Sequence, residues 1–360
     1  MRIAQVAPLV ESVPPKHYGG TERIVAYLTE ELVRLGHNVT LFASGDSVTS
    51  AELVPVCRRS FRQNKRAKDY LSREVLLMDH VMQRADEFDV IHFHTGCLHY
   101  LISRHLTVPH VTTLHGRLDT PELLRLYERF RELPMISISN AQRGPWPCAN
   151  WQATIYHGLP QNLFRFHPEP GGYLAFLGRI SPEKRVDRAI EIAKRVGIPL
   201  KIAAKVDPAD RRYFKREIEP LLTESHVEWI GEISDQQKNE FLGNAYALLF
   251  PIDWPEPFGL VMIEAMACGT PVIAYERGSV PEVMENGVTG FIVNEIEQAV
   301  EAVGRVCDLS RASCRDVFEK RFTASRMASD YLDAFVRLAD SWMGSVEESQ
   351  QSSLHAFQSA

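Results

Sequence analysis

The chain has 360 residues, of which 45% are hydrophobic and 24% charged, and its formal net charge is −6 at pH 7. This length and composition are typical of two globular domains, and the negative charge disfavours attraction of the whole molecule to nucleic acid. The sequence shows no apolar stretch of about eighteen residues, no signal-like N-terminus and no C-x-x-C pair among its six cysteines, so we expect a cytoplasmic protein without a membrane span, disulfides or a zinc site.

The first half of the sequence is predicted to alternate strands with helices. A helix is expected from Thr21, because apolar residues recur there every three or four positions until Gly36. The apolar segments predicted as strands are 2–7, 38–43, 89–94, 110–116 and 135–140. This alternation predicts a parallel sheet covered by helices on both faces, which binds ligands at the carboxyl ends of its strands.

The same alternation restarts near residue 172. Strands are predicted at 173–178, 199–206, 227–233, 245–251 and 271–276, and helices at 182–197, 235–243 and 259–268. We therefore expect two α/β domains, at 1–165 and 170–324, separated by a segment rich in proline and glycine. A further helix is predicted over 325–340, and a serine- and glutamine-rich tail from about 345 is expected to be disordered. Neither G-x-G-x-x-G after the first strand nor a P-loop motif is present.

The segment "FLGRISPEKR" (176–185) indicates an anion site after the first strand of the second domain. Ser181 is expected to cap a helix and Pro182 to begin it, which would place Lys184 in a first turn where the helix dipole disfavours a cation. Lys184, Arg179 and backbone N–H groups would together bind a diphosphate. The alternative is that both cations are solvated surface charges.

Two glutamates flank the apolar segment "PFGLVMI". Glu256 is predicted to lie in a turn after the strand "ALLFP", and Glu264 inside an apolar helix. A buried carboxylate needs a partner, and Glu264 fits the hydroxyls of a ribose, whereas Glu256 fits a second sugar. The alternative for Glu264 is an ion pair with a neighbouring arginine or lysine.

Other candidate positions are weaker. Gly19 and Gly20 could bring backbone N–H groups close to a phosphate or form a plain turn, and His115 is placed at the carboxyl end of a strand. Ile233 could line an apolar slot for a nucleotide base. His92 and His94 share one strand face near His99, but a metal site is not expected. The basic segment 57–68 is expected to be a mobile solvated loop, with an anionic acceptor or a membrane surface as alternative contacts.

At these residues the chain resembles the retaining nucleotide-sugar glycosyltransferases of family 4, which have the GT-B fold of two Rossmann-like domains facing a cleft. The resemblance extends over roughly 1–340. It rests most on "EPFGLVMIE", the E-x7-E motif, followed by "AMACGTPVIA" and "NGVTGFIV", and on "GRISPEK" and the early "YGG". One departure is Gln161, where relatives often carry an acidic residue.

The resemblance implies roles for the candidate residues. Arg179 and Lys184 would bind the donor diphosphate, Glu264 the ribose, and Glu256 the transferred sugar together with backbone groups around Phe258, Gly259 and Leu260. Gly19 and Gly20 would cover the phosphate, and His115 would contact the sugar near the reacting carbon. The final helix at 325–340 would cross back to the first domain.

The resemblance also implies the reaction. The donor is a UDP-, GDP- or ADP-sugar, with UDP-glucose the first to consider, and the acceptor is a hydroxyl of unknown origin. No metal and no cofactor are expected, since the two cations would neutralise the leaving phosphate. The alternatives are a sugar-nucleotide epimerase or phosphorylase on the same fold, or a nucleotide-sugar-binding protein without activity.

Overall fold

The computed structural model describes residues 1–16, 19–64 and 68–358, with side chains up to Trp342. The chain divides into two compact units. The N-terminal unit consists of 1–138, 145–155 and the C-terminal segment from 324, and the C-terminal unit consists of 139–144 and 156–323. The division between the units at 155 and 156 lies before the proline- and glycine-rich segment in which we expected it. Of the helices formed by the described residues, none is long and apolar enough to cross a membrane.

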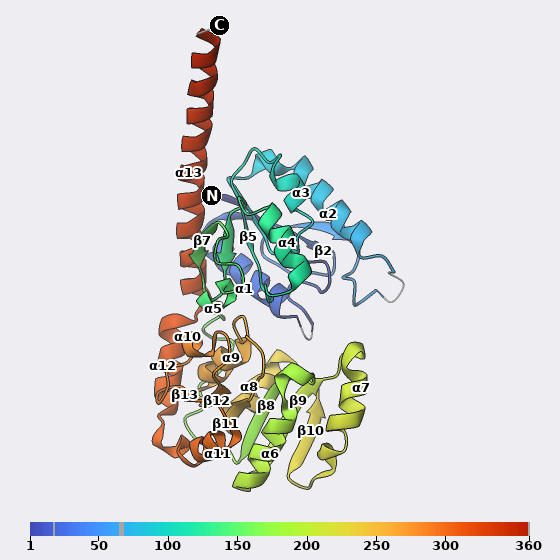
Figure 1. Cartoon of the computed structure of the whole chain (residues 1–360), viewed down its shortest axis with the longest axis vertical. Helices are drawn as coiled ribbons and strands as arrows, with labels where there is room; N and C mark the ends of the chain where they lie inside the picture. The colour runs from blue at the N-terminus through green and yellow to red at the C-terminus, as the bar shows by residue number, and fades with distance from the viewer. Residues whose placement is uncertain (17–18, 65–67, 359–360) are drawn as a thin grey trace. The chain divides into compact units, whose positions relative to one another are not determined.

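The N-terminal unit is built on a seven-stranded parallel sheet with the strand order β3-β2-β1-β4-β5-β6-β7 (Figure 1). Its strands are β1 (Arg2–Val6), β2 (Asn38–Ser44), β3 (Glu52–Cys57), β4 (Val90–Phe93), β5 (His110–Thr113), β6 (Met135–Ser137) and β7 (Trp151–Thr154). Its helices are α1 (Gly20–Arg34), α2 (Leu71–Gln83), α3 (Tyr100–Ser103), α4 (Pro121–Arg129) and α13 (Ala324–Gln358).

The C-terminal unit is built on a six-stranded parallel sheet with the order β10-β9-β8-β11-β12-β13. Its strands are β8 (Tyr173–Arg179), β9 (Leu200–Lys205), β10 (Val227–Gly231), β11 (Ala245–Phe250), β12 (Val272–Tyr275) and β13 (Gly290–Val293). Its helices are α5 (Asn140–Arg143), α6 (Val186–Val196), α7 (Arg211–Tyr213), α8 (Asp235–Gly243), α9 (Leu260–Cys268), α10 (Val280–Val283), α11 (Ile296–Gly304) and α12 (Arg311–Arg321).

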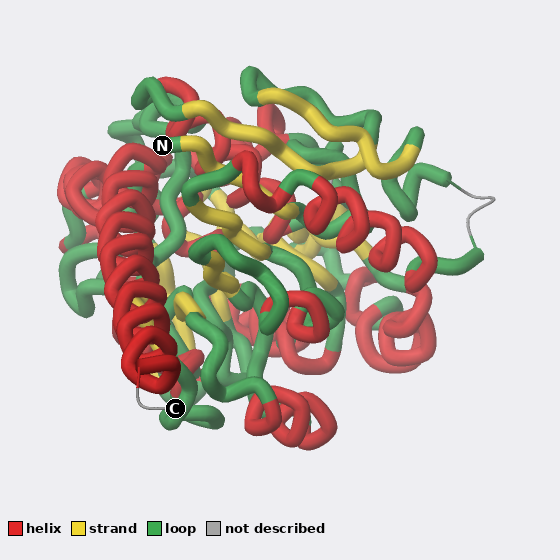
Figure 2. The backbone as a smooth tube through the Cα atoms, turned by 90° about the horizontal axis from the view of Figure 1, so that it is seen from above, coloured by secondary structure: helices red, strands yellow, loops and turns green. Residues whose placement is uncertain are grey.

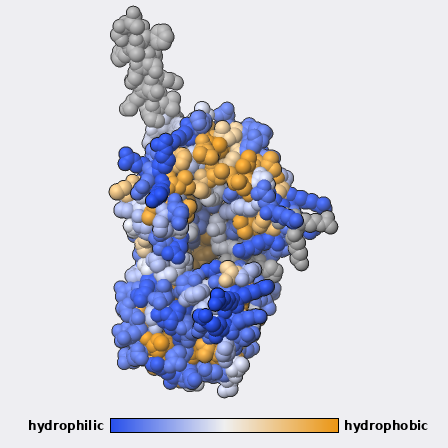
Figure 3. Space-filling view, turned by 45° about the vertical axis from the view of Figure 1, so that its right-hand side comes forward, coloured by the Kyte–Doolittle hydropathy of each residue, from blue (hydrophilic) through white to orange (hydrophobic). Residues whose placement is uncertain are grey.

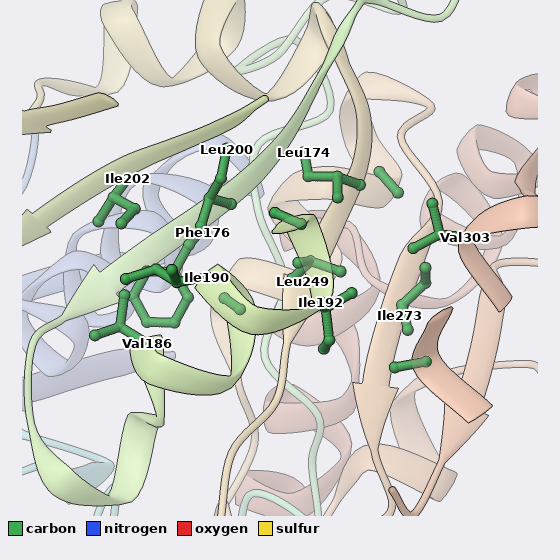
Figure 4. Close-up of a cluster of buried hydrophobic side chains, with 14 of the residues drawn as sticks. Leu174, Phe176, Val186, Ile190, Ile192, Leu200, Ile202, Leu249, Ile273 and Val303 are labelled. Carbon is green, nitrogen blue, oxygen red and sulfur yellow. The ribbon is translucent and has the colours of Figure 1, made fainter. Parts of the chain in front are cut away.

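In each unit helices flank the parallel strands, as Figure 2 shows for the whole chain, so the predicted α/β class is confirmed. The buried faces of strands and helices meet in apolar clusters. In the C-terminal unit, Figure 4 shows Phe176 of β8 and Ile202 of β9 packed against Val186 and Ile190 of α6. This core fixes the carboxyl end of β8, after which the candidate site begins.

The last helix departs from one prediction. Residues 345–358 were expected to be disordered, but the backbone of α13 is helical through Gln358. This stretch contains neither proline nor glycine, and its glutamate, glutamine, leucine and alanine residues are good helix formers, which accounts for the continuation. The helix begins in the N-terminal unit, where Ser325 donates a hydrogen bond to Glu31 of α1 and the Tyr331 hydroxyl lies 3.1 Å from that of Thr113 on β5.

Candidate functional site

Apart from Ile233, the predicted site residues of the C-terminal unit follow two adjacent central strands. β8 and β11 are paired in the sheet, so the loops after Arg179 and after Phe250 leave from the same edge. In an open parallel sheet this edge is where ligands bind. The loop after β11 carries Glu256 and continues into α9, which carries Glu264.

Lys184 does not lie in the first turn of a helix, so that prediction was wrong. Pro182–Lys184 form a short 3-10 turn, Arg185 adopts a left-handed conformation with φ 52°, and α6 begins only at Val186. The Ser181 side chain makes no capping hydrogen bond. Lys184 is therefore placed by its side-chain contacts, and the dipole of α6 does not act on it as a first-turn residue.

Lys184 and Glu256 contact each other directly. The Lys184 ammonium forms an ion pair with Oε2 of Glu256, and both side chains are mostly buried. The same oxygen accepts a hydrogen bond from the Trp254 indole N–H at 2.9 Å. The ammonium also lies 4.9 Å from the centroid of the Trp254 ring, a distance that permits a cation–π contact. An ammonium has three N–H donors, so Lys184 retains the capacity to bind a further anion while it holds Glu256.

The loop after β12 fixes the backbone of Glu256. The Ser279 N–H donates to the Glu256 carbonyl at 2.9 Å, and the Ser279 hydroxyl donates to the Phe258 carbonyl at 2.9 Å. Gly278 has φ +56°, and a Cβ atom there would lie 2.3 Å from the Glu256 carbonyl oxygen. Only glycine fits this close approach without moving the loop that presents Glu256.

Arg179 faces a separate group of carboxylates. Its guanidinium forms an ion pair with Glu183 and lies 3.6 Å from Asp207 and 3.8 Å from Asp210. Lys205, at the end of β9, bonds Asp207 at 2.9 Å. Among these side chains, desolvation raises the pKa of Asp210, whereas hydrogen bonds and the Arg179 charge lower the pKa of Glu183 in spite of its burial. The structure therefore shows Arg179 as a part of a mixed charge network.

Glu264 is paired with a lysine, which is the alternative that the sequence left open. Its carboxylate oxygen Oε1 lies 2.7 Å from the Lys238 ammonium, and its side chain is only 4% exposed. Lys238 lies on α8 and also approaches Asp235 at 3.4 Å. The ion pair compensates for burial of the carboxylate, and it orients Glu264 between the two helices.

The remaining donor-side candidates surround this loop. Phe258 is buried and its ring packs edge-on against His157, with centroids 4.8 Å apart. Gly259 precedes α9 with φ 81°, and Leu260 is the first residue of that helix. A Cβ atom at Gly259 would lie 3.4 Å from Cγ of Glu256, so the start of α9 is close to this side chain. Ile233 is half-buried in the segment between β10 and α8.

Three candidate residues belong to the N-terminal unit. Gly19 precedes α1 and approaches Pro15 so closely that a Cβ atom would lie 2.8 Å from the Pro15 Cβ, and Gly20 is the first residue of the helix. The residues 17–18 of the same stretch lie outside the described part. His115 follows β5, and its Nε2 lies 2.9 Å from Nδ1 of His94.

The histidines near β4 were considered as metal ligands. The rings of His92 and His94 lie 3.9 Å apart on one strand face, as predicted, whereas His99 stacks on Phe93 and bonds Thr112. Across the described residues, no three histidine, cysteine or acidic side chains form a cluster that could hold a metal ion.

The described part of the basic segment 57–68 makes two contacts within its own unit. Ser60 is buried and bonds Asp46 at 2.8 Å through its N–H, and Arg62 forms an ion pair with Glu11 at 3.0 Å. These contacts join parts of the loop to its own unit, while the side chains of Arg58, Arg59 and Arg62 are exposed, in agreement with a solvated segment. Residues 65–67 lie outside the described residues.

Sequence reasoning missed Lys238, Trp254 and Gly278. Lys238 is one of several charged residues on a predicted helix, and nothing in its neighbours indicates a buried partner 26 positions away. Trp254 lies two residues before Glu256, and this proximity in sequence was a usable signal.

The chain contains two Rossmann-like parallel sheets, and Lys184 and Glu256 form an ion pair at the carboxyl edge of the second sheet. These features define a protein of the GT-B class. The sequence matches the family model Glycosyl transferases group 1 over residues 164–320 and the model Glycosyltransferase Family 4 over residues 18–145. The two matches together cover most of the chain, which belongs to these glycosyltransferases.

Relatives support this assignment. The chain is 25% identical over 231 residues to an uncharacterised glycosyltransferase of Methanocaldococcus jannaschii, in a match that covers 59% of this chain and 62% of that protein. It is also 25% identical over 348 residues to an alpha-maltose-1-phosphate synthase of Mycolicibacterium smegmatis, covering 83% of this chain and 86% of that one. Among solved structures, HepE of Anabaena, in complex with UDP, superposes with a TM-score of 0.74 at 19% identity over 94% of this chain and all of HepE.

Proposed function

We propose that the protein is a retaining, metal-independent glycosyltransferase that moves a sugar from a nucleoside diphosphate sugar to a hydroxyl acceptor. The observation that carries the proposal is the Lys184–Glu256 pair, which joins the loop after β8 to the loop after β11 at the carboxyl edge of the sheet. A donor needs positive charge for its diphosphate and an acceptor of hydrogen bonds for its sugar, and this pair supplies both within one contact.

Each residue then has a role. Lys184 and Arg179 bind the diphosphate and stabilise the charge that develops on it when the sugar–phosphate bond breaks. Glu256 accepts hydrogen bonds from hydroxyls of the transferred sugar, with the N–H groups around Phe258, Gly259 and Leu260. Glu264, oriented by Lys238, accepts hydrogen bonds from the ribose, and Ile233 lines the place of the base. In the N-terminal unit, Gly19 and Gly20 cover the phosphate and His115 contacts the sugar.

The chemistry follows from these roles. The bond between the anomeric carbon and the phosphate oxygen breaks with oxocarbenium character, and the departing phosphate oxygen takes the proton of the acceptor hydroxyl. The acceptor attacks from the face that the phosphate leaves, so the anomeric configuration is retained. No carboxylate acts as a nucleophile, in contrast to retaining glycosidases with their close carboxylate pair.

The choice of donor rests on the relatives. HepE structures contain UDP, UDP with glucose, and UDP-glucose, so UDP-glucose is the first donor to test, followed by GDP- and ADP-sugars. The experiment incubates the protein in EDTA with this panel and measures release of the nucleoside diphosphate. We expect slow release from one donor, lost in Lys184→Met and retained in Lys201→Met, a control in which the lysine removed pairs with Glu228 at the surface.

Other results would point elsewhere. Conversion of the donor to an epimer without acceptor would indicate an epimerase, and donor binding without turnover under any acceptor would indicate a binding protein. Once an acceptor is known, a β-linked product from an α-linked donor would contradict retention.

We also infer that the N-terminal unit contacts an anionic membrane surface. Leu71, Val75 and Leu76 on α2 are 58%, 52% and 49% exposed, and the loop before this helix presents the exposed Arg58 and Arg59. Figure 3 shows hydrophobic side chains gathered on one face of this unit beside hydrophilic ones. Exposed apolar side chains and exposed cations on the same unit favour an interfacial contact with anionic lipid.

Sedimentation with vesicles tests the contact. The protein is expected to sediment with anionic vesicles at low salt and not with neutral ones, and Leu71→Ser/Val75→Ser is expected to weaken this, unlike the control Val336→Ser on α13. Failure to sediment with anionic vesicles would contradict the contact.

A further inference from the structure

The residue after Lys184 has an unusual backbone conformation. Arg185 has φ 52° and ψ 51°, and within the described part of the chain it is the one residue other than glycine with a positive φ. The left-handed conformation brings Cβ too close to the following carbonyl oxygen, so it costs free energy at residues that carry a Cβ atom. Such a conformation persists where surrounding contacts hold it, and it is frequent at functional sites.

The side chain of Arg185 makes contacts on two sides. Its guanidinium donates two hydrogen bonds to Asp187, from Nε at 3.0 Å and from Nη2 at 2.8 Å, and a third from Nη1 to Asp253 at 3.1 Å. Asp187 belongs to the first turn of α6, whereas Asp253 lies in the loop after β11, three residues before Glu256. These contacts tie the turn at Arg185 both to the helix that follows it and to the loop that carries Glu256.

Asp253 joins the loop after β11 to the loop after β8. Its backbone N–H donates to the Glu183 carbonyl at 2.9 Å, and its carboxylate accepts hydrogen bonds from Arg185 and, at 2.9 Å, from Arg188 on α6. Burial opposes the charged form, but the positive charges and hydrogen bonds of Arg188 and Arg185 lower the pKa of Asp253 below its ordinary value. Asp253 is therefore an ionised group that binds the loop after β8 through its backbone and its side chain.

Three consecutive residues of the loop after β8 thus contact the loop after β11. The Glu183 carbonyl and the Arg185 guanidinium bind Asp253. The Lys184 ammonium, between them in sequence, binds Glu256. Because Arg185 separates the 3-10 turn that contains Lys184 from α6, a change in the Arg185 backbone would change the direction of the Lys184 side chain.

We propose that Arg185 and Asp253 are positioning residues for donor binding, in which the left-handed turn at Arg185, held by Asp253, directs the Lys184 ammonium to the donor diphosphate. This inference rests on the proposed function, which assigns the diphosphate to Lys184. Partly exposed ion pairs usually add little to stability. A network that served stability alone would leave donor binding unchanged when it is removed, so the two roles can be separated by experiment.

Glycine and alanine at position 185 separate the backbone conformation from the loss of the side chain. Arg185→Gly and Arg185→Ala both remove the guanidinium, but only glycine adopts the left-handed conformation without steric cost. Binding of UDP, GDP and ADP to the full-length protein is measured by titration calorimetry at a temperature where both variants are folded. For the nucleoside diphosphate that the wild type binds, we expect Arg185→Ala to bind about fivefold more weakly than Arg185→Gly.

A second background shows whether this difference acts through Lys184. In Lys184→Met, glycine and alanine at position 185 should give equal affinities, because the group that the turn positions has been removed. Equal binding by Arg185→Gly and Arg185→Ala in the presence of Lys184 would overturn the proposal. A difference that survives in Lys184→Met would overturn it as well.

The order of stabilities provides a matched control. The thermal midpoint of Arg185→Gly should exceed that of Arg185→Ala. At Arg195, in the last turn of α6, alanine should be more stable than glycine, because the backbone there is helical. The same order at both positions would contradict the left-handed conformation of residue 185.

Asp253→Asn tests the second residue by the sign of its effect. Removal of a negative charge near an anion site should by itself strengthen binding of a nucleoside diphosphate, whereas loss of positioning should weaken it. We expect binding about threefold weaker than in the wild type. Unchanged or stronger binding would remove Asp253 from the proposal.

The position of Lys184 can also be followed without a ligand. In full-length protein labelled with 15N in its lysines, the Nζ–H signal of Lys184 is identified by its loss in Lys184→Met. Ammonium protons in a buried ion pair exchange slowly with water, so we expect this signal in the wild type and in Arg185→Gly, and its loss in Arg185→Ala. Absence of the signal in the wild type, or its persistence in Arg185→Ala, would contradict the positioning role. If the wild type binds no nucleoside diphosphate, the proposed function fails, while this signal still decides whether Arg185 positions Lys184.

Discussion

Removal of the Lys238 ammonium should destabilise the C-terminal unit, because it leaves the Glu264 carboxylate without its cation. The two charges lie 2.7 Å apart, Glu264 is 4% exposed and Lys238 13% exposed. Breaking a buried pair typically costs about 3–5 kcal/mol. Lys238 retains some contact with solvent, so we expect Lys238→Met to lower the free energy of unfolding by about 2–4 kcal/mol.

The measurement is denaturant unfolding at pH 7, together with the thermal midpoint. A loss of about 2–4 kcal/mol corresponds to a decrease of about 5–15 °C for a unit of this size. The double variant Lys238→Met/Glu264→Gln provides the critical comparison, because it removes the unpaired charge as well, and it should recover most of the loss.

Stability and donor binding should respond differently in the double variant. The double variant should be stable but bind donor more weakly than the wild type, since a glutamine accepts hydrogen bonds from ribose hydroxyls less strongly than a carboxylate. A single variant within about 0.5 kcal/mol of the wild type would refute the importance of the pair. A double variant as unstable as the single one would show that the loss came from packing.

Three further predictions concern the same fold. Gly278→Ala should lower the free energy of unfolding by about 2 kcal/mol or more and weaken donor binding, because its Cβ would meet the Glu256 backbone. The control Gly304→Ala should do neither, because no atom of the surroundings lies within 4 Å of a Cβ placed there. Equal thermal midpoints for the two variants would contradict this prediction. Arg311→Leu should lower the free energy of unfolding by about 3 kcal/mol, because the buried guanidinium donates to Thr270 Oγ1 and to three backbone carbonyls. A loss in denaturant unfolding no larger than that of Arg216→Ala, at an exposed arginine, would show that these bonds are dispensable. The free energy of unfolding should fall on acidification from pH 6.5 to 5, because burial lowers the pKa of His99 to about 3 and the unfolded chain then binds a proton that the folded chain does not. Over this range the free energy of unfolding of His99→Gln should fall by about 2 kcal/mol less than that of the wild type. Parallel pH profiles of the two proteins would refute this prediction.

The central architecture was predictable from local patterns. The strands in the middle of both sheets are continuous apolar runs, such as 245–250 and 173–178, because helices cover both of their faces. The strands that were missed, β3, β7 and β13, all lie at sheet edges, where an apolar run is shorter or interrupted. The start of α6 was misplaced because Pro182 indicates a helix start, whereas the left-handed Arg185 delays it.

Order along the chain was enough to predict which residues of the candidate site follow which strand. Glu256 after β11 and Arg179 at the end of β8 were both placed correctly at strand ends. The contacts of these side chains could be seen only in the folded chain. Lys184 meets Glu256, Lys238 meets Glu264, and Arg185 meets Asp253, and each contact joins segments far apart in sequence. Strand order and helix packing bring such segments together, and neither can be predicted from the contacting residues alone.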